Sequence, residues 1–206
     1  MAIKVSATIV DIRTDTPRST DVFFVDSNVW FWVGYTNASL SSRNNQSSVY
    51  PPYLNKSLAV NARLHKCTLS FSELAHSIER SEYDIFVKSS PGRTNLKKKD
   101  YRHDPTQRTI VVTEITNTWL LADAMTQGTS IEVNVSNTAI QNALINIQTQ
   151  ALDGYDLFML EAVLAAGITS FITDDIDFGL VPGIQVFTAN QILIKAARAQ
   201  NQLVKR

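Results

Sequence analysis

The chain has 206 residues, with 19 basic and 19 acidic side chains and a formal net charge of zero. This length is enough for one domain with a sizeable core, and the charge balance excludes a protein that binds polyanions through its overall charge. The single cysteine excludes an internal disulfide framework. Cys67 lies in an apolar run, which favours a buried thiol in a reducing compartment.

The N-terminal region and the apolar runs bear on the cellular compartment. Charged side chains interrupt the first twenty residues, so we expect no signal peptide. Apolar runs stay well short of the roughly 20 residues that a membrane span needs. We therefore expect a cytoplasmic protein with no membrane partner.

Apolar patterns predict short strands alternating with helices. The predicted strands cover residues 3–12 (an edge strand), 22–25, 66–69, 130–135, 168–172 and 184–187. The predicted helices cover residues 27–33, 51–65, 70–87, 109–125, 138–149, 156–167 and 189–204, and the Ser- and Asn-rich residues 36–49 predict a loop. This alternation predicts an α/β fold, a three-layer α/β/α sandwich with a mostly parallel central sheet flanked by helices. We expect a single domain over residues 1–206, with its core at about 21–190 and a C-terminal helix at about 189–204.

Residues 88–108 differ in composition from the rest of the chain. Seven of them are basic and two are acidic, and Pro91, Gly92 and Pro105 interrupt the stretch. This composition predicts an exposed basic insertion. It is either a solvated loop or a contact for an RNA backbone, because phosphate contacts supply much of the affinity for nucleic acid. The candidate RNA contacts are Lys97, Lys98, Lys99 and Arg102.

Acidic residues stand where predicted strands end or predicted helices begin. They are Asp26 after strand 22–25, Glu73 and Asp156 near the starts of helices, and Asp174, Asp175 and Asp177 after strand 168–172. Because parallel strands place their carboxyl ends at one edge of the sheet, these side chains are expected to converge. Two carboxylates ~4 Å apart repel by about 4 kcal/mol at an effective dielectric of 20, unless a proton or a cation intervenes. Such a cluster suits Mg²⁺ or Mn²⁺, and its natural chemistry is phosphodiester hydrolysis by a metal-activated water.

Several of these acids also have structural explanations. Glu73 could complete a capping box with Ser70, and Asp156 could be a helix-start acid worth at most about 1 kcal/mol. Asp26 directly ends an apolar strand, so its carboxylate needs a partner or a water-filled cleft. Because adjacent strand residues face opposite ways, we expect Asp175 and Asp177 to share a direction and Asp174 to differ.

Four segments, in order, resemble the four motifs of PIN-domain proteins. They read FFVDSNV at 23–29, LSFSEL at 69–74, YDLF at 155–158 followed by Ala162 and Gly167, and ITDDIDF at 172–178. The resemblance covers roughly residues 21–190. It implies a three-layer α/β/α fold and a Mg²⁺- or Mn²⁺-dependent endoribonuclease that hydrolyses RNA phosphodiester bonds. Many members of the family are VapC-type toxins that an antitoxin protein inhibits by occupying the site, and similar proteins often form homodimers.

The resemblance also implies roles for individual residues. The implied catalytic and metal-binding set is Asp26, Glu73, Asp156, Asp175 and Asp177, and the supporting set is Ser27, Thr173 and Asp174. In this set Asp177 is either a further ligand or a group that orients a metal-bound water. The chain is longer than the compact toxins, through residues 36–49 and 88–108, so the toxin role is open.

Two other functions remain as alternatives. The first is a catalytically inactive PIN domain that binds RNA or a protein. The second is a phosphoryl-transfer domain with Asp26 as acceptor, although Asn28 stands where such phosphatases carry a second aspartate.

Overall fold

A parallel β-sheet forms the centre of the computed structural model, which describes residues 3–40, 45–89, 92 and 95–206. Within this part of the chain the sheet has seven strands in the order β4-β3-β2-β5-β6-β1-β7, and every neighbouring pair is parallel. The strands are β1 (Thr8–Asp11), β2 (Val22–Val25), β3 (Arg63–Cys67), β4 (Ser130–Ile131), β5 (Ser170–Ile172), β6 (Gln185–Thr188) and β7 (Leu203–Val204).

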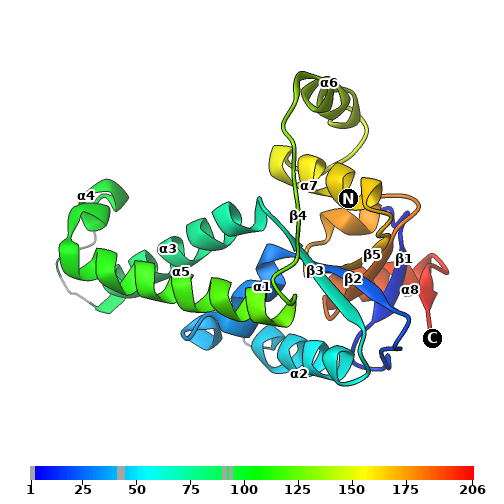
Figure 1. The fold of residues 1–206 in the computed structure, drawn as a ribbon, viewed down its shortest axis with the longest axis horizontal. Helices are drawn as coiled ribbons and strands as arrows, with labels where there is room; N and C mark the ends of the chain where they lie inside the picture. Colours follow the sequence, from blue (N-terminus) through cyan, green and yellow to red (C-terminus); the bar gives the residue numbers. More distant parts are fainter. Residues whose placement is uncertain (1–2, 41–44, 90–91, 93–94) are drawn as a thin grey trace.

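Helices cover both faces of this sheet (Figure 1). They are α1 (Ser27–Gly34), α2 (Gln46–Ala59), α3 (Ser70–Ser89), α4 (Lys98–His103), α5 (Pro105–Met125), α6 (Asn137–Asn146), α7 (Gly154–Ala165) and α8 (Gln191–Ala199), with 3-10 turns η1 (Ala38–Leu40) and η2 (Asp177–Leu180). Along β2, Phe23 and Val25 pack in the core with α1, α2, α3 and α5, whereas Phe24 packs with α7 and α8. This alternation is the sign of a strand buried on both faces, and it confirms the predicted α/β fold with helices on either side of a parallel sheet.

The order of the strands creates a crevice at one edge of the sheet. From β2 the chain moves outward through β3 to β4, and it then returns to place β5 on the other side of β2. In open parallel sheets, ligands bind beyond the carboxyl ends of the strands where the strand order reverses in this way. Here that position lies at the ends of β2 and β5.

The second helix begins earlier in the chain than predicted. It starts at Gln46 and contains Pro51 and Pro52, whereas the sequence predicted a loop over 36–49 and a helix beginning at the prolines. The reason is tertiary: the buried Tyr50 hydroxyl donates to Asp174 Oδ1 over 2.9 Å, which fixes the turn before the prolines. Residues 41–44 of the predicted loop lie outside the described residues.

The end of the second helix and the lengths of several other elements also differ from the predictions. The helix ends at Ala59 rather than near residue 65, because Asn61 takes a left-handed conformation and β3 then begins at Arg63. Among the other elements, α5 begins four residues before the predicted helix, and β4 is limited to two residues.

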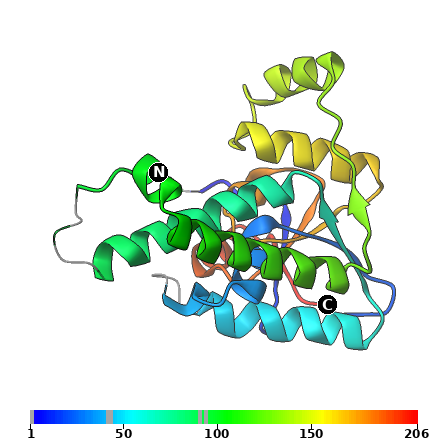
Figure 2. The same cartoon turned by 60° about the vertical axis from the view of Figure 1, so that its left-hand side comes forward.

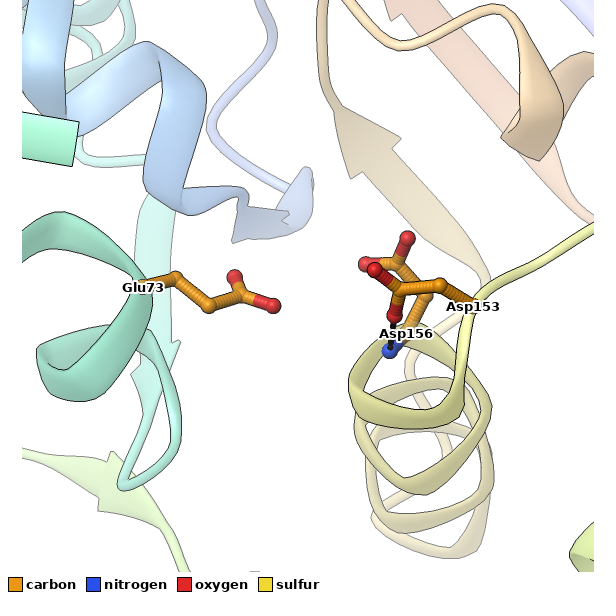
Figure 3. A group of neighbouring side chains, drawn as sticks. All are labelled: Glu73, Asp153 and Asp156. Carbon is orange, nitrogen blue, oxygen red and sulfur yellow. Dashed lines mark hydrogen bonds between the residues drawn. The ribbon is translucent and has the colours of Figure 1, made fainter. Parts of the chain in front are cut away.

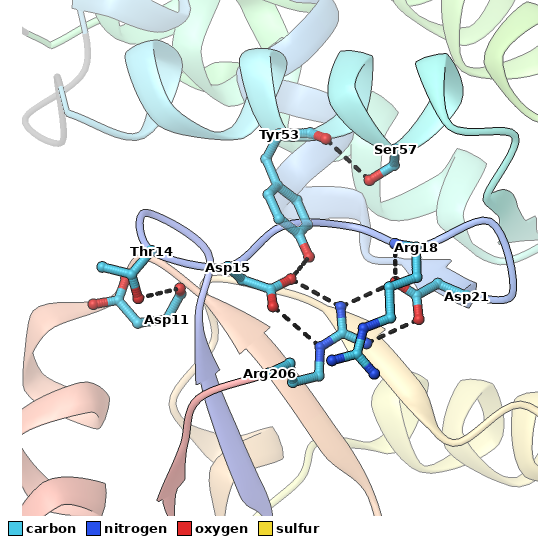
Figure 4. Close-up of polar contacts among 8 residues, drawn as sticks. All are labelled: Asp11, Thr14, Asp15, Arg18, Asp21, Tyr53, Ser57 and Arg206. Carbon is cyan, nitrogen blue, oxygen red and sulfur yellow. Dashed lines mark hydrogen bonds and ion pairs between the residues drawn. The ribbon is translucent and has the colours of Figure 1, made fainter.

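The C-terminal residues form a helix and then a strand, rather than the single helix predicted over 189–204. Asn201 has a positive φ, and beyond it β7 pairs with β1, so β1 is an inner strand and not the predicted edge. The Arg206 guanidinium anchors this tail by bonding to Asp15 and Asp21, each over 2.8 Å (Figure 4). Tyr53 of α2 donates to the same Asp15 carboxylate over 2.6 Å, which ties the tail to the helical layer.

The basic insertion is partly helical, and most of its described residues are exposed, as predicted. Its residues 98–103 form α4, and Asp104 caps the start of α5. In the two ribbon views α3 and α5 lie side by side and extend from the sheet, with α4 at their far end (Figure 1 and Figure 2). Tyr101 is buried between Tyr83 and Phe86, which explains why this polar segment folds. Among the described residues, no helix has the length and apolar character that crossing a membrane requires.

Candidate metal centre

A cavity of about 560 Å³ lies where the sheet topology predicts a crevice. Residues at the ends of β2 and β5 and near the starts of α3 and α7 line it. Among the described residues, its carboxylates come from Asp26, Glu73, Asp153, Asp156 and Asp175. The structure therefore brings together four members of the predicted acidic set and adds a fifth acid, whereas Asp177 is not among the lining residues.

Asp26 is held rigidly at the end of β2. Its Oδ1 accepts from the backbone N–H of Ser27 over 2.6 Å, so the carboxylate caps α1. Its Oδ2 accepts from Thr173 Oγ1 over 2.6 Å and from Asn28 Nδ2 over 2.5 Å. These bonds fix the direction of a side chain that is only 3% exposed.

Ser27 connects this strand end to α3. Its hydroxyl donates to Glu73 Oε2 over 2.7 Å and also lies 3.3 Å from Asp26 Oδ1. Glu73 thus projects across the cavity toward β2, while the Ser70 hydroxyl lies 3.3 Å from Cys67 Sγ. The side chain of Glu73 is engaged at the cavity, which favours the site interpretation over a capping box.

Asp153 is the residue that the sequence reasoning missed. Its Oδ1 accepts from the backbone N–H groups of Tyr155 and Asp156 over 2.8 and 3.0 Å, so it is the N-cap of α7. Figure 3 shows Asp153 and Asp156 at the start of α7, with Glu73 pointing toward them from α3. One carboxylate oxygen from each of these three residues lies within 4.8 Å of the other two.

The pKa values of Asp26, Glu73 and Asp156 are raised above their usual range. Burial, followed by the charges of Asp26 and Glu73, raises the pKa of Asp156 to about 9. Burial also raises the pKa of Glu73 to about 7 and that of Asp26 to about 6, although hydrogen bonds from Ser27 and Thr173 oppose the shift. Removing carboxylates from water while crowding like charges is expected to have this effect.

The three aspartates after β5 point in different directions. Asp175 lines the acidic cavity, and its Oδ1 accepts from the backbone N–H of Asp177 over 2.9 Å. Asp174 is buried on another side, where its Oδ2 accepts from Gln46 Nε2 over 3.1 Å. The predicted difference between Asp174 and Asp175 is therefore present, whereas Asp177 begins η2 instead of sharing the cavity lining with Asp175.

The predicted RNA-contact residues lie on or beside α4. Lys97 and Lys99 are exposed. Arg102 forms a bidentate ion pair with Glu79 of α3, at 2.7 and 2.5 Å, and Lys98 Nζ lies 3.6 Å from the same carboxylate. At least two of these cations therefore bind a buried acid of the protein itself.

The donor set fits a hard divalent cation. It consists of carboxylate oxygens, which Mg²⁺ and Mn²⁺ prefer, and it adjoins a cavity with room for water and a phosphate group. A divalent charge here would favour the ionised forms that burial and mutual repulsion oppose. Glu73, Asp153 and Asp156 are near enough to share one ion, with Asp26 and Asp175 on the adjoining wall.

Comparisons with known proteins give no family assignment. No family model matches the chain, and no curated protein matches it. Among solved structures, the crystal structure of VapBC2 from Rickettsia felis bound to a DNA fragment from its promoter shares 11% identity with the chain, with a TM-score of 0.39. That match covers 81% of this chain and 98% of the other. A likeness of this size does not establish common function, so the proposals below rest on the chain's own residues.

Proposed function

We propose that this protein is a Mg²⁺- or Mn²⁺-dependent endoribonuclease of the PIN type. The observation that carries the proposal is the meeting of Asp26, Glu73, Asp153, Asp156 and Asp175 in one cavity at the reversal point of a parallel sheet. The ordered resemblance of four sequence segments to PIN motifs supports it independently, because those segments supply four of these five acids. An antitoxin partner and a homodimer would follow from the same family resemblance.

Each residue has a distinct part in this proposal. Glu73, Asp153 and Asp156 would hold the metal, with Asp26 and Asp175 completing its surroundings. A bound Mg²⁺ or Mn²⁺ supplies Lewis acidity, which activates water and offsets charge on the phosphate. Ser27, Asn28 and Thr173 orient the Asp26 and Glu73 carboxylates through the hydrogen bonds described above. The backbone N–H of Asp177 orients Asp175.

The deciding experiment compares the wild type with Asp26→Asn on single-stranded and structured RNA in the presence of Mn²⁺. The amide keeps the shape of the side chain but removes its charge, so we expect cleavage to fall by at least about 100-fold, the scale on which one preorganised electrostatic group matters. The exposed Asp84 of α3 offers a matched control, and Asp84→Asn should cleave normally. Equal activity in the wild type and Asp26→Asn would end the proposal.

Calorimetry separates the nuclease from the alternative of an inactive binding module. The nuclease requires saturable binding of Mn²⁺ that weakens in Asp156→Asn. RNA binding without any uptake of Mg²⁺ or Mn²⁺ would favour the binding module instead.

A further inference from the structure

A second cavity, of about 530 Å³, lies next to the acidic one between α3 and α5. His76 lines both cavities, so the two are neighbours along the same helix. Glu73, His76 and Glu79 follow one another at intervals of three residues, which places them along one side of α3. Six residues of helix advance by about 9 Å, so the second cavity is only a short distance from the candidate metal ligands.

The second cavity is lined by positively charged side chains, which the acidic cavity lacks. Arg102 and Arg108 line it, and both lie beside the buried carboxylate of Glu79, as does Lys98. Among the residues that line the cavity, two arginines and one carboxylate leave one positive charge in excess. The side chains of Arg102 and Arg108 are about half exposed, and Arg108 Nη1 is 3.5 Å from Glu79, at the limit of a hydrogen bond. A phosphate group could therefore bind these guanidinium groups without displacing Glu79.

An aromatic ring stands in the same cavity. Phe71 is 44% exposed, and it packs edge-on against Trp119 with ring centroids 5.3 Å apart. Val112 and Ile115 continue the apolar wall along α5. Cations that follow a backbone, together with an exposed ring for stacking, are what proteins use to bind single-stranded nucleic acid. A duplex keeps its bases stacked inside, so it could not use the ring in this way.

We infer that the second cavity binds the segment of a single-stranded RNA that neighbours the cleaved phosphodiester. Arg102 and Arg108 take a phosphate, and the face of Phe71 stacks on a base, so that the strand passes over His76 into the acidic cavity. The inference rests on the proposed nuclease function for its substrate, and it adds a strand direction along α3 and a preference for unpaired RNA. Complementary charge favours this occupant, because the cavity is cationic and the acidic centre beside it would repel an anion that it did not hold through metal.

The test measures, by anisotropy, the binding of a short fluorescent single-stranded RNA and of the same RNA in a duplex. The measurements are made in EDTA, which withholds the metal that cleavage requires, over a series of KCl concentrations. The variants are Arg108→Gln, Phe71→Leu and the control Lys195→Gln, which removes one exposed positive charge from α8. Arg108→Gln should weaken binding and lower the slope of log K against log salt by about 0.7, the share of one phosphate contact to a single strand. Phe71→Leu keeps the apolar bulk, so it should weaken binding about fivefold with an unchanged slope. Lys195→Gln should alter neither quantity.

Three outcomes would overturn the inference. They are an absence of binding, an equal salt slope for Arg108→Gln and Lys195→Gln, and equal affinity for duplex and single-stranded RNA. Each variant must have the same melting temperature as the wild type. If Phe71→Leu fails this check, Arg108→Gln still decides the outcome. Because binding is measured without metal, failure here differs from failure of the nuclease proposal, which would appear as absent cleavage in Mn²⁺ by a protein that still binds the strand.

Discussion

Replacing Asp156 by asparagine is expected to stabilise the metal-free protein at neutral pH. The pKa of this carboxyl rises from 3.8 to about 9 on folding, chiefly through burial and then through the charges of Asp26 and Glu73. The folded state therefore binds the proton more tightly than the unfolded chain does. The contribution of Asp156 to stability is neutral below pH 3.8, and it becomes increasingly unfavourable as the pH rises toward 9.

The free-energy cost of ionising Asp156 in the folded protein depends on how far the pH lies above 3.8. Between pH 3.8 and pH 7 the cost grows to at most ~4 kcal/mol, at about 1.4 kcal/mol for each pH unit. We expect about half of this limit, ~2 kcal/mol, because Asp156 is partly exposed and its neighbours share the protonation. For a chain of this length ~2 kcal/mol corresponds to a melting temperature higher by about 4–8 °C in Asp156→Asn.

The assay is thermal unfolding in EDTA, followed by circular dichroism from pH 4 to pH 8, with Asp84→Asn as control. The wild type and Asp156→Asn should melt together near pH 4 and separate as the pH rises, with the variant melting higher. Adding Mn²⁺ at pH 7 should reverse the order, because ion binding stabilises only a protein that keeps its ligands. A difference independent of pH, or a variant that is less stable at pH 7 in EDTA, would refute the electrostatic reasoning.

Two further predictions concern the parts of the fold around the site. Glu79→Gln should release α4 and speed the hydrogen exchange of the amides of residues 98–103, because the amide cannot hold the Arg102 fork; unchanged exchange would contradict this role. Arg206→Ala should cost about 2 kcal/mol, below the 3–5 of a fully buried broken pair, because the guanidinium keeps some contact with solvent. Chemical denaturation measures this loss, and an unchanged midpoint would show that the tail is held by β7 alone.

The parts of the fold that the sequence predicted are those in which local pattern and burial agree. The run VFFV at 22–25 is typical of a strand covered on both faces, and β2 has the predicted bounds. Asp26 could be singled out for the same reason, since an acid that ends such a strand needs an unusual environment. Gly167 has φ +77, in agreement with its predicted place at the end of a helix.

The differences arise where distant contacts decide the structure. The sequence near Gln46 does not predict the hydrogen bond from Tyr50 to Asp174, yet that contact sets the start of α2. Asp153 lies between the predicted helices 138–149 and 156–167, and its capping role depends on the exact start of the second of them. Its position three residues before Asp156 could have identified it, because this spacing places both acids at the start of the same helix. The roles predicted for the acidic set, and the metal itself, stay predictions until ion binding is measured.

The two outer strands of the sheet, β4 and β7, are each only two residues long in the described part of the chain. Such short edge strands offer few free backbone groups to an incoming strand, and they protect a sheet against edge-to-edge pairing with another molecule. A protein that associates with this chain is therefore poorly placed to extend its sheet. Contact through helices or through the two cavities would leave the hydrogen-bonded ladder unchanged.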